Sequence, residues 1–286
     1  MKPLGGQIPA PMLVLLAGLT VQLSSALAKS VFVVAGPLGT VFLRVSLSAV
    51  LLLLLWRPKW QGPIRQHWSL IAAYGSGLAV MNTCFYLAID RIPLGVAVAI
   101  EFTGPLGLAV IKSRRWLDLL WVGLAGSGIM LLSPLQGSSL DPVGLGFAMA
   151  AALAWAAYIL LTEATGRRIP GIEGLIWAMV FGATLLAPIG IGAAGSSLIN
   201  GRLIAIAAGV ALLSSATYAL ELLALRRLPV SAFGVLLSTE PMLAAAAGFL
   251  LLGEILTLRS IAAVVLISIA AAGAARYGTA PAAETL

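Results

Sequence analysis

Ten apolar segments of about 20 residues follow one another along this chain, and they constrain its fold more than any other feature. An α-helix of about 20 apolar residues crosses the hydrocarbon core of a bilayer. Of the 286 residues, 60% are hydrophobic and 9% are charged, whereas a soluble domain has about 25% charged residues. We therefore predict an all-α integral membrane protein with ten transmembrane helices, at roughly 11–28, 38–56, 69–89, 93–111, 116–133, 143–162, 172–194, 203–225, 230–252 and 258–275.

The connections between these segments are short, so the function has to lie among the helices. The N-terminus has one basic residue, Lys2, and no signal-peptide pattern, so the first segment is expected to remain as a helix. The single Cys84 lies within an apolar segment and is interpreted as an inert buried thiol. The sequence thus predicts a multi-pass protein without a separate catalytic domain.

Several functional classes lack the residues that they require. The phosphate-binding loop of ATP-driven transporters, Gly-x-x-x-x-Gly-Lys-Ser/Thr, does not occur. A serine nucleophile at Ser127 would need a base, but the only histidine, His67, lies in a predicted loop. The sequence has no cluster of metal ligands, and its basic residues form short groups between spans, not a nucleic-acid surface. We therefore expect no enzyme activity, no cofactor, no metal and no nucleic-acid partner, and a passive channel stays open.

The distribution of cations predicts the orientation of the chain. Basic residues gather on the cytoplasmic side of membrane proteins. If the N-terminus is cytoplasmic, three arginines fall in outer loops, namely Arg91, Arg202 and Arg259. Twelve cations then fall inside: Lys2, Arg57, Lys59, Arg65, Lys112, Arg114, Arg115, Arg167, Arg168, Arg226, Arg227 and Arg276. Both termini are therefore predicted to be cytoplasmic.

A weak internal repeat divides the chain in two. The sequence Arg91-Ile92-Pro93 matches Arg227-Leu228-Pro229 at an offset of 136 residues, and Thr103 and Pro105 match Thr239 and Pro241 at the same offset. Each match ends one segment and opens the next. We predict two five-helix repeats, residues 1–137 and 138–286, which are inverted because five is odd. Inverted repeats with broken helices near the membrane midplane are a transporter architecture that works by alternating access.

Glu101 and Pro105 lie inside an apolar segment, where both are costly. An ionised carboxylate at bilayer depth costs roughly 2.5–3.5 kcal/mol on insertion scales. Pro105 has no backbone N–H, and its ring displaces the carbonyl four residues back, which is that of Glu101. Gly104 and Pro105 therefore predict a helix break beside the carboxyl group. Glu101 is a candidate for binding a substrate amine or a coupling proton, and a structural acid is the other interpretation.

Two further acids lie in apolar segments of the second half. Glu240 precedes Pro241, which predicts a second helix break, and small residues share its helical face. Substrate binding or coupling and a structural or hinge role are both open for Glu240. Glu221 lies nearer the inner end of its segment, where it either contributes to coupling or pairs with Arg226 or Arg227.

Two cations and a set of polar or aromatic residues complete the candidates. Arg44 and Lys29 either snorkel to the membrane surface or turn inward to bind a substrate carboxylate. Together with Glu101 they would suit a zwitterion. Five residues on other segments could line a cavity, although some are expected to be bystanders: Asn82, Tyr86, Trp155, Tyr158 and Tyr218.

Several of these residues belong to a longer ordered set that resembles the EamA-type ten-helix branch of the drug/metabolite transporter superfamily, and within it exporters of threonine and homoserine. The similarity runs over most of the chain. The motifs that carry it are Ala26-Leu27-Ala28-Lys29-Ser30, Arg44, Met81-Asn82, Phe85-Tyr86-Leu87, Pro93-Leu94-Gly95, Glu101-Phe102-Thr103-Gly104-Pro105-Leu106, Ser113-Arg114-Arg115, Trp155, Tyr158-Ile159-Leu160, Arg227-Leu228-Pro229, Phe233-Gly234, Glu240-Pro241 and Leu252-Gly253-Glu254.

The resemblance implies a fold and a function. The fold is an inverted repeat around a central cavity formed chiefly by the first, third, fourth, sixth, eighth and ninth helices. The implied function is export of a small amphipathic substrate, here a small amino acid, across the inner membrane of a bacterium, with protons as the coupling ion in an antiport. Export of other metabolites or drugs by the same fold is the alternative that the resemblance leaves open. The number of subunits is not predicted.

Overall fold

The computed structural model is all-helical and describes residues 8–60, 62–113, 116–132, 140–169, 171–225, 227–228 and 230–277. Four of the predicted inner cations, Lys2, Arg114, Arg115 and Arg226, lie outside the described residues, as does the predicted repeat boundary at 137. The described helices are α1 (Ala10–Trp56), α2 (Pro63–Gln66), α3 (Trp68–Ile89), α4 (Leu94–Glu101), α5 (Thr103–Ser113), α6 (Trp116–Leu132), α7 (Pro142–Gly166), α8 (Glu173–Ala194), η3 (Gly195–Ile199), α9 (Gly201–Leu225), α10 (Val230–Leu237), α11 (Glu240–Leu252) and α12 (Leu258–Tyr277).

Each predicted apolar segment is helical, because a backbone in hydrocarbon has to satisfy its hydrogen bonds within the segment. Among the described residues, six helical stretches are long and apolar enough to cross a membrane, and shorter apolar stretches occupy Leu94–Leu108, Leu119–Leu132 and Leu258–Ala274. Fold class is therefore confirmed at the level of an all-helical, multi-span membrane protein.

The first two predicted segments are joined in α1, which is kinked at Gly36. Gly36 has φ 64 and ψ 168, a conformation that is essentially restricted to glycine, and Pro37 opens the next helical stretch. The first stretch runs to this kink and not to residue 28 as expected. It extends because Val31 and Ala35 pack in a buried cluster with Ala194, Leu203 and Ala207.

Two predicted segments are broken, and they break at equivalent places. Helix α4 ends at Glu101 and α5 begins at Thr103, while α10 ends at Leu237 and α11 begins at Glu240. Thr103 Oγ1 donates to the Ile100 carbonyl at 2.6 Å, and Thr239 Oγ1 donates to the Leu236 carbonyl at 2.7 Å. The two threonine donors are 136 residues apart, and so are the two carbonyl acceptors. This is the offset of the sequence repeat. Both divisions fall a few residues before the proline, and Pro105 and Pro241 themselves lie within the first turns of α5 and α11.

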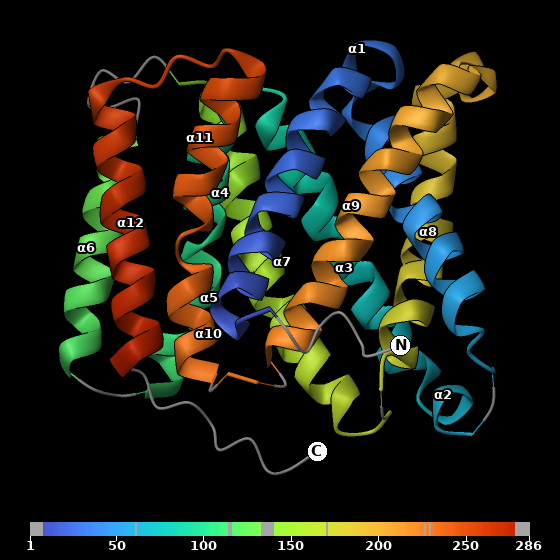
Figure 1. The fold of residues 1–286 in the computed structure, drawn as a ribbon, viewed down its shortest axis with the longest axis horizontal. Helices are drawn as coiled ribbons and strands as arrows, with labels where there is room; N and C mark the ends of the chain where they lie inside the picture. The colour runs from blue at the N-terminus through green and yellow to red at the C-terminus, as the bar shows by residue number, and fades with distance from the viewer. Residues whose placement is uncertain are drawn as a thin grey trace. The chain divides into compact units, whose positions relative to one another are not determined.

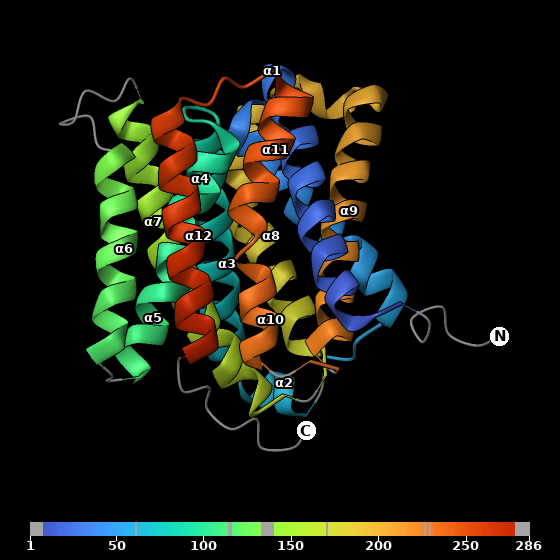
Figure 2. The same ribbon diagram turned by 60° about the vertical axis from the view of Figure 1, so that its left-hand side comes forward.

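The chain forms two compact units that do not follow the order of the sequence. Unit 1 comprises Met1–Leu23, Ile92–Pro142 and Ala216–Leu286, and unit 2 comprises Ser24–Arg91 and Val143–Ser215. In unit 1, α6 packs on α12 and α4 packs on α11, as both views show (Figure 1, Figure 2). In unit 2, α3 packs on α8. Helices α1 and α9 contribute to both units.

Glycines set the closest helix contacts within each unit. A Cβ atom at Gly95 on α4 would lie 2.5 Å from the Cα atom of Ala245 on α11. In unit 2, a Cβ atom at Gly75 on α3 would clash with the Ala178 carbonyl oxygen on α8. Small residues allow backbones to approach, which is how helices associate in a membrane without a hydrophobic driving force.

The start of α4 is held by a hydrogen bond to a residue that lies 160 positions later in the chain. Glu254 Oε2, just beyond α11, accepts a 2.8 Å hydrogen bond from the backbone N–H of Leu94. The first N–H groups of a helix have no partner inside the helix, and a carboxylate there also complements the helix dipole. This bond therefore fixes the beginning of the helix that carries Glu101.

Candidate functional site

Arg44 is buried inside unit 2 and does not snorkel to a surface. It lies on α1 beyond the Gly36 kink, and its side chain is 9% exposed. Its Nε atom donates to Ser214 Oγ on α9 at 3.0 Å, and its Nη1 atom donates to Asn82 Oδ1 on α3 at 2.9 Å. The guanidinium thus joins three helices, and the inward interpretation of Arg44 is the one that the structure shows.

The hydrogen bonds around Arg44 have a definite direction. Ser24 Oγ donates to the Val210 carbonyl at 3.0 Å and lies 2.8 Å from Ser214 Oγ. Because the single hydroxyl proton of Ser24 is used by the carbonyl, Ser214 donates to Ser24 and accepts from Arg44. Asn82 Nδ2 donates to the Leu78 carbonyl at 2.9 Å, which turns its oxygen toward Arg44. These bonds fix the orientation of the guanidinium.

Tyr86 lies beside this arginine. The Arg44 Cζ atom is 5.5 Å from the centre of the Tyr86 ring, within cation–π range. Phe32 and Phe85 contact the same ring, with centroid separations of 5.4 and 6.1 Å. Tyr86 is fully buried, and within the described part of the chain its hydroxyl oxygen makes no hydrogen bond that satisfies distance and angle. The structure therefore brings Arg44, Asn82 and Tyr86 together.

The three predicted acids form a second group, in unit 1. Glu101 is the last residue of α4, Glu221 lies on α9, and Glu240 is the first residue of α11. Glu240 is 8% exposed, and it interacts electrostatically with both Glu221 and Glu101. A Cβ atom at Gly18 would lie 3.4 Å from Glu240 Cγ, so a glycine of α1 leaves room for this side chain.

These acids are not arranged as a metal site. No group of three or more histidine, cysteine, aspartate or glutamate side chains in the described ranges could hold a metal ion. Glu221 and Arg227 form no ion pair in this part of the chain, and Arg227 Nη1 donates to the Ile8 carbonyl at 3.3 Å. The predicted alternative partner Arg226 lies outside the described residues.

The remaining candidates are distributed along the helices. Lys29 is half-buried on α1, Trp155 is half-buried on α7, and Tyr218 is half-buried on α9. Tyr158 Oη lies 3.3 Å from Tyr74 Oη, and their ring centroids are 5.2 Å apart. Tyr158 thereby packs against the cluster that contains Ile64 and Ile169, and not with Arg44. Gly104 and Pro241 are buried, and Pro105 is half-buried, at the two helix breaks.

Sequence reasoning missed the serines and threonines that support these groups. Ser24 and Ser214 orient Arg44 in unit 2, and in unit 1 Thr20 Oγ1 lies 3.0 Å from Thr217 Oγ1. The signal was present, because each of these polar residues lies well inside an apolar segment. Such residues form hydrogen bonds between helices in a membrane.

Comparison with known proteins agrees with this architecture. Residues 142–276 match the EamA-like transporter family. The threonine/homoserine exporter RhtA of Salmonella typhimurium (strain LT2) is 40% identical over 252 residues, which cover 86% of this chain and 85% of the relative. RhtA of Escherichia coli (strain K12) is 40% identical over 256 residues with the same coverage.

One solved crystal structure shares the fold of this chain, with a TM-score of 0.64 and 19% sequence identity. The matched region covers 93% of this chain and 96% of the chain in that structure. The identity with the two exporters extends over both predicted repeats and confirms the resemblance inferred from the motifs. It also confirms the prediction of a transporter and not an enzyme. This chain belongs to the EamA-like transporter family.

Proposed function

We propose that this chain is a secondary active transporter that exports small amino acids such as threonine and homoserine across the inner membrane of a bacterium. The similarity to RhtA over most of the chain supports this substrate class. The observation that carries the proposal is the buried guanidinium of Arg44, which Asn82 and Ser214 hold in one orientation. Ionisable residues inside a membrane protein mark substrate or ion pathways.

In this proposal Arg44 binds the substrate carboxylate. A guanidinium matches a carboxylate with two parallel N–H bonds, and a fixed guanidinium loses less side-chain entropy when it binds. Lys29 is the second cation for the same group. The hydroxyl of Tyr86 is a suitable partner for the hydroxyl that threonine and homoserine both carry, because it lies beside Arg44 and is buried. Trp155, Tyr158 and Tyr218 contribute apolar contacts along the substrate path.

The acids of unit 1 carry the coupling proton in this proposal. Glu240 is buried and interacts with Glu221 and Glu101, so three carboxyl groups share one region in which like charges repel. Glu101 also remains a candidate for the substrate amine. The helix breaks at Gly104-Pro105 and at Pro241 provide the hinges.

We also infer that residues 1–137 and 138–286 are inverted repeats around a central cavity, with both termini cytoplasmic. The equivalent helix breaks and the Thr103 and Thr239 bonds support the repeat. Ile64 and Ile169 share one cluster, which supports placing the Arg57 to Arg65 loop and the Arg167 loop at one face. That grouping is what the positive-inside rule requires of them.

Uptake into inside-out vesicles tests the proposal, because it reproduces export. Vesicles with the chain take up labelled threonine, homoserine, an aromatic amino acid or a cationic drug, with and without an imposed proton gradient. We expect saturable uptake of threonine and homoserine that the gradient stimulates and that an Arg44→Gln variant loses. Vesicles without the chain provide the background.

The alternatives give different results. Uptake of only the drug or the aromatic amino acid would keep the fold and reject the substrate class. Non-saturable uptake would indicate a channel. Uptake that is saturable but indifferent to the pH gradient at matched membrane potential would indicate facilitated diffusion without proton coupling.

A further inference from the structure

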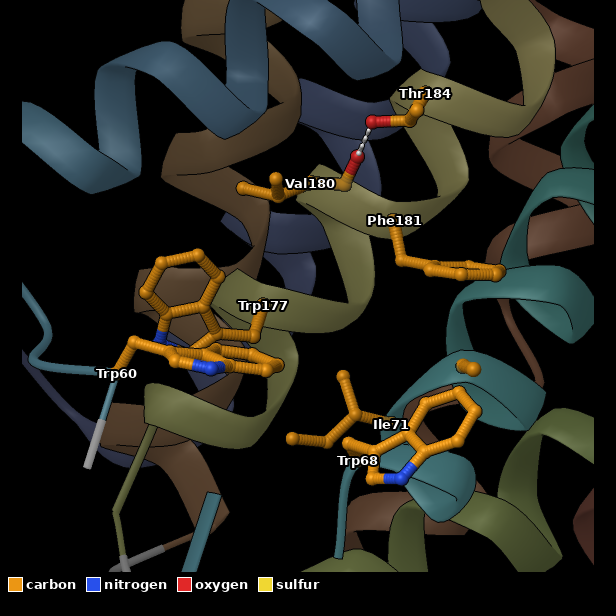
Figure 3. Close-up of a pocket in the computed structure, with 8 residues that line it drawn as sticks. Trp60, Trp68, Ile71, Trp177, Val180, Phe181 and Thr184 are labelled. Atoms are coloured by element: carbon orange, nitrogen blue, oxygen red, sulfur yellow. Dashed lines mark hydrogen bonds between the residues drawn. The ribbon is translucent and has the colours of Figure 1, made fainter. Parts of the chain in front are cut away.

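An aromatic cavity of about 230 Å³ lies in unit 2 between α3 and α8, and its lining residues differ from those assigned to transport. Trp60 and Trp177 meet edge to face, with ring centroids 4.7 Å apart, and Trp68 borders the cavity from the start of α3 (Figure 3). The other lining residues are Ile71, Ala72, Val180, Phe181 and Thr184. Thr184 donates its hydroxyl proton to the Val180 carbonyl at 2.9 Å, so the wall is apolar in character.

The cavity is open at its rim. Trp60 is 45% exposed and Trp68 is 60% exposed, although both are large aromatic residues. The indole nitrogen of Trp177 is buried and makes no hydrogen bond within the described part of the chain. Tryptophan is enriched at the membrane–water boundary, where its ring lies at the level of the lipid head groups. The rim therefore has the composition of a site at that boundary.

Cations surround the same end of unit 2. Arg57 and Lys59 directly precede Trp60, and Arg65 lies on α2, where Ile64 packs with Ile71 of α3. Ile169 joins the same cluster and brings Arg167 and Arg168 to this end. The side chains of these five cations are exposed. The acids near them are Glu163, which pairs with Arg167, and Glu173, which begins α8.

We propose that this cavity binds one acyl chain of an anionic phospholipid, whose phosphate lies among Arg57, Lys59 and Arg65. The apolar wall accepts hydrocarbon, and the positive excess at the rim complements a negative head group. Basic residues at a membrane surface attract anionic lipids, and basic pockets between helices bind their head groups. A zwitterionic phospholipid offers the same acyl chain without the net negative charge, so it binds more weakly.

Native mass spectrometry of the full-length chain released from detergent tests this proposal. The protein is titrated with dioleoyl-phosphatidylglycerol or dioleoyl-phosphatidylcholine, and the first bound lipid is counted. We expect tighter binding of phosphatidylglycerol. The double variant Lys59→Gln/Arg65→Gln should weaken phosphatidylglycerol binding about tenfold and leave phosphatidylcholine binding unchanged. The control variant Arg91→Gln/Arg202→Gln removes the same amount of charge elsewhere in the chain and should not change the binding of either lipid.

The apolar wall is tested separately. Ala72→Phe places a ring inside the cavity and should weaken the binding of both lipids. Thermal unfolding in detergent shows whether the variant is folded. Glycerol phosphate at millimolar concentration should not displace phosphatidylglycerol, because it lacks an acyl chain. Equal binding of the two lipids, an equal loss in both double variants, or displacement by glycerol phosphate would overturn the proposal.

Discussion

Asn82 Oδ1 accepts a 2.9 Å hydrogen bond from Arg44 Nη1 across two helices of unit 2. The amide cannot rotate freely, because its nitrogen donates to the Leu78 carbonyl one turn earlier. Asn82 therefore acts as a fixed acceptor that orients the guanidinium. Its position on α3, four residues before Tyr86, places the acceptor and the aromatic ring on the same face of that helix.

Asn82→Ala should weaken substrate binding. The substitution leaves a buried guanidinium N–H without its acceptor, which costs about 1–3 kcal/mol. We expect the KM for threonine to rise about tenfold, measured in inside-out vesicles at equal protein amount. Asn200→Ala is the control, since Asn200 caps α9 through the backbone N–H of Arg202. It should lower thermal stability and leave the KM unchanged; an equal rise of KM in both variants would contradict the role of Asn82.

Neutralising the acids of unit 1 should abolish proton-driven threonine transport while threonine exchange continues. We expect Glu240→Gln to reduce gradient-driven threonine uptake at least tenfold, because a carboxamide cannot carry the proton, while exchange of labelled for unlabelled threonine continues. Glu101→Gln and Glu221→Gln are measured in the same two assays. Glu173→Gln, at the start of α8, is the control. Normal expression with unchanged uptake in Glu101→Gln would remove Glu101 from the mechanism.

Gly95→Ala should destabilise unit 1. The added methyl group would lie 2.5 Å from the Ala245 Cα atom, so α4 and α11 would have to separate. Over-packing of this kind costs about 1–3 kcal/mol, and more where backbone has to move. Thermal unfolding in detergent measures the loss. Gly107→Ala on α5 meets no atom within 4 Å and should be neutral by comparison; a loss of equal size there would argue against the contact.

Gly36→Ala should destabilise the kink in α1. A Cβ atom at Gly36 would meet no atom of another part of the chain within 4 Å, so crowding is not the cause. The cost comes from φ 64 and ψ 168, which alanine adopts only with strain of about 1–3 kcal/mol. Gly192→Ala on α8 is also in open space but has no positive φ, and it should not lower the unfolding temperature. If both variants unfold at the wild-type temperature, the strain assigned to position 36 is refuted.

Length and hydropathy were enough to predict the helical segments, and proline was enough to predict the breaks. Pro105 and Pro241 cannot donate a backbone hydrogen bond, and the helices break within a few residues before each of them. The same reasoning failed at the end of the first segment, which was predicted to end at residue 28, just before Lys29. The helix continues past Lys29 because the packing of Val31 and Ala35 outweighs a single cation.

The candidate site was only partly predictable, because an apolar helix has no polar face that shows which side is buried. Arg44 and Asn82 were singled out as residues, but their contact depends on how α1 and α3 are rotated. Ser214 was missed because a serine in an apolar helix can as easily donate its hydroxyl proton to a carbonyl of the same helix. Tyr158 carried the same aromatic signal as Tyr86, yet it pairs with Tyr74 in a different cluster.

The interleaving of the two units has a consequence for biosynthesis. Unit 2 is complete once the ribosome has made Ser215, whereas unit 1 combines Met1–Leu23 with Ala216–Leu286. Chains grow from the N-terminus, and domains generally fold as units during synthesis. Unit 2 can therefore pack while the nascent chain is still being inserted, and the early part of α1 has to wait for α10, α11 and α12. Nascent chains stalled shortly after Ser215 should already contain the Arg44–Asn82 contact, before Glu240 has been translated.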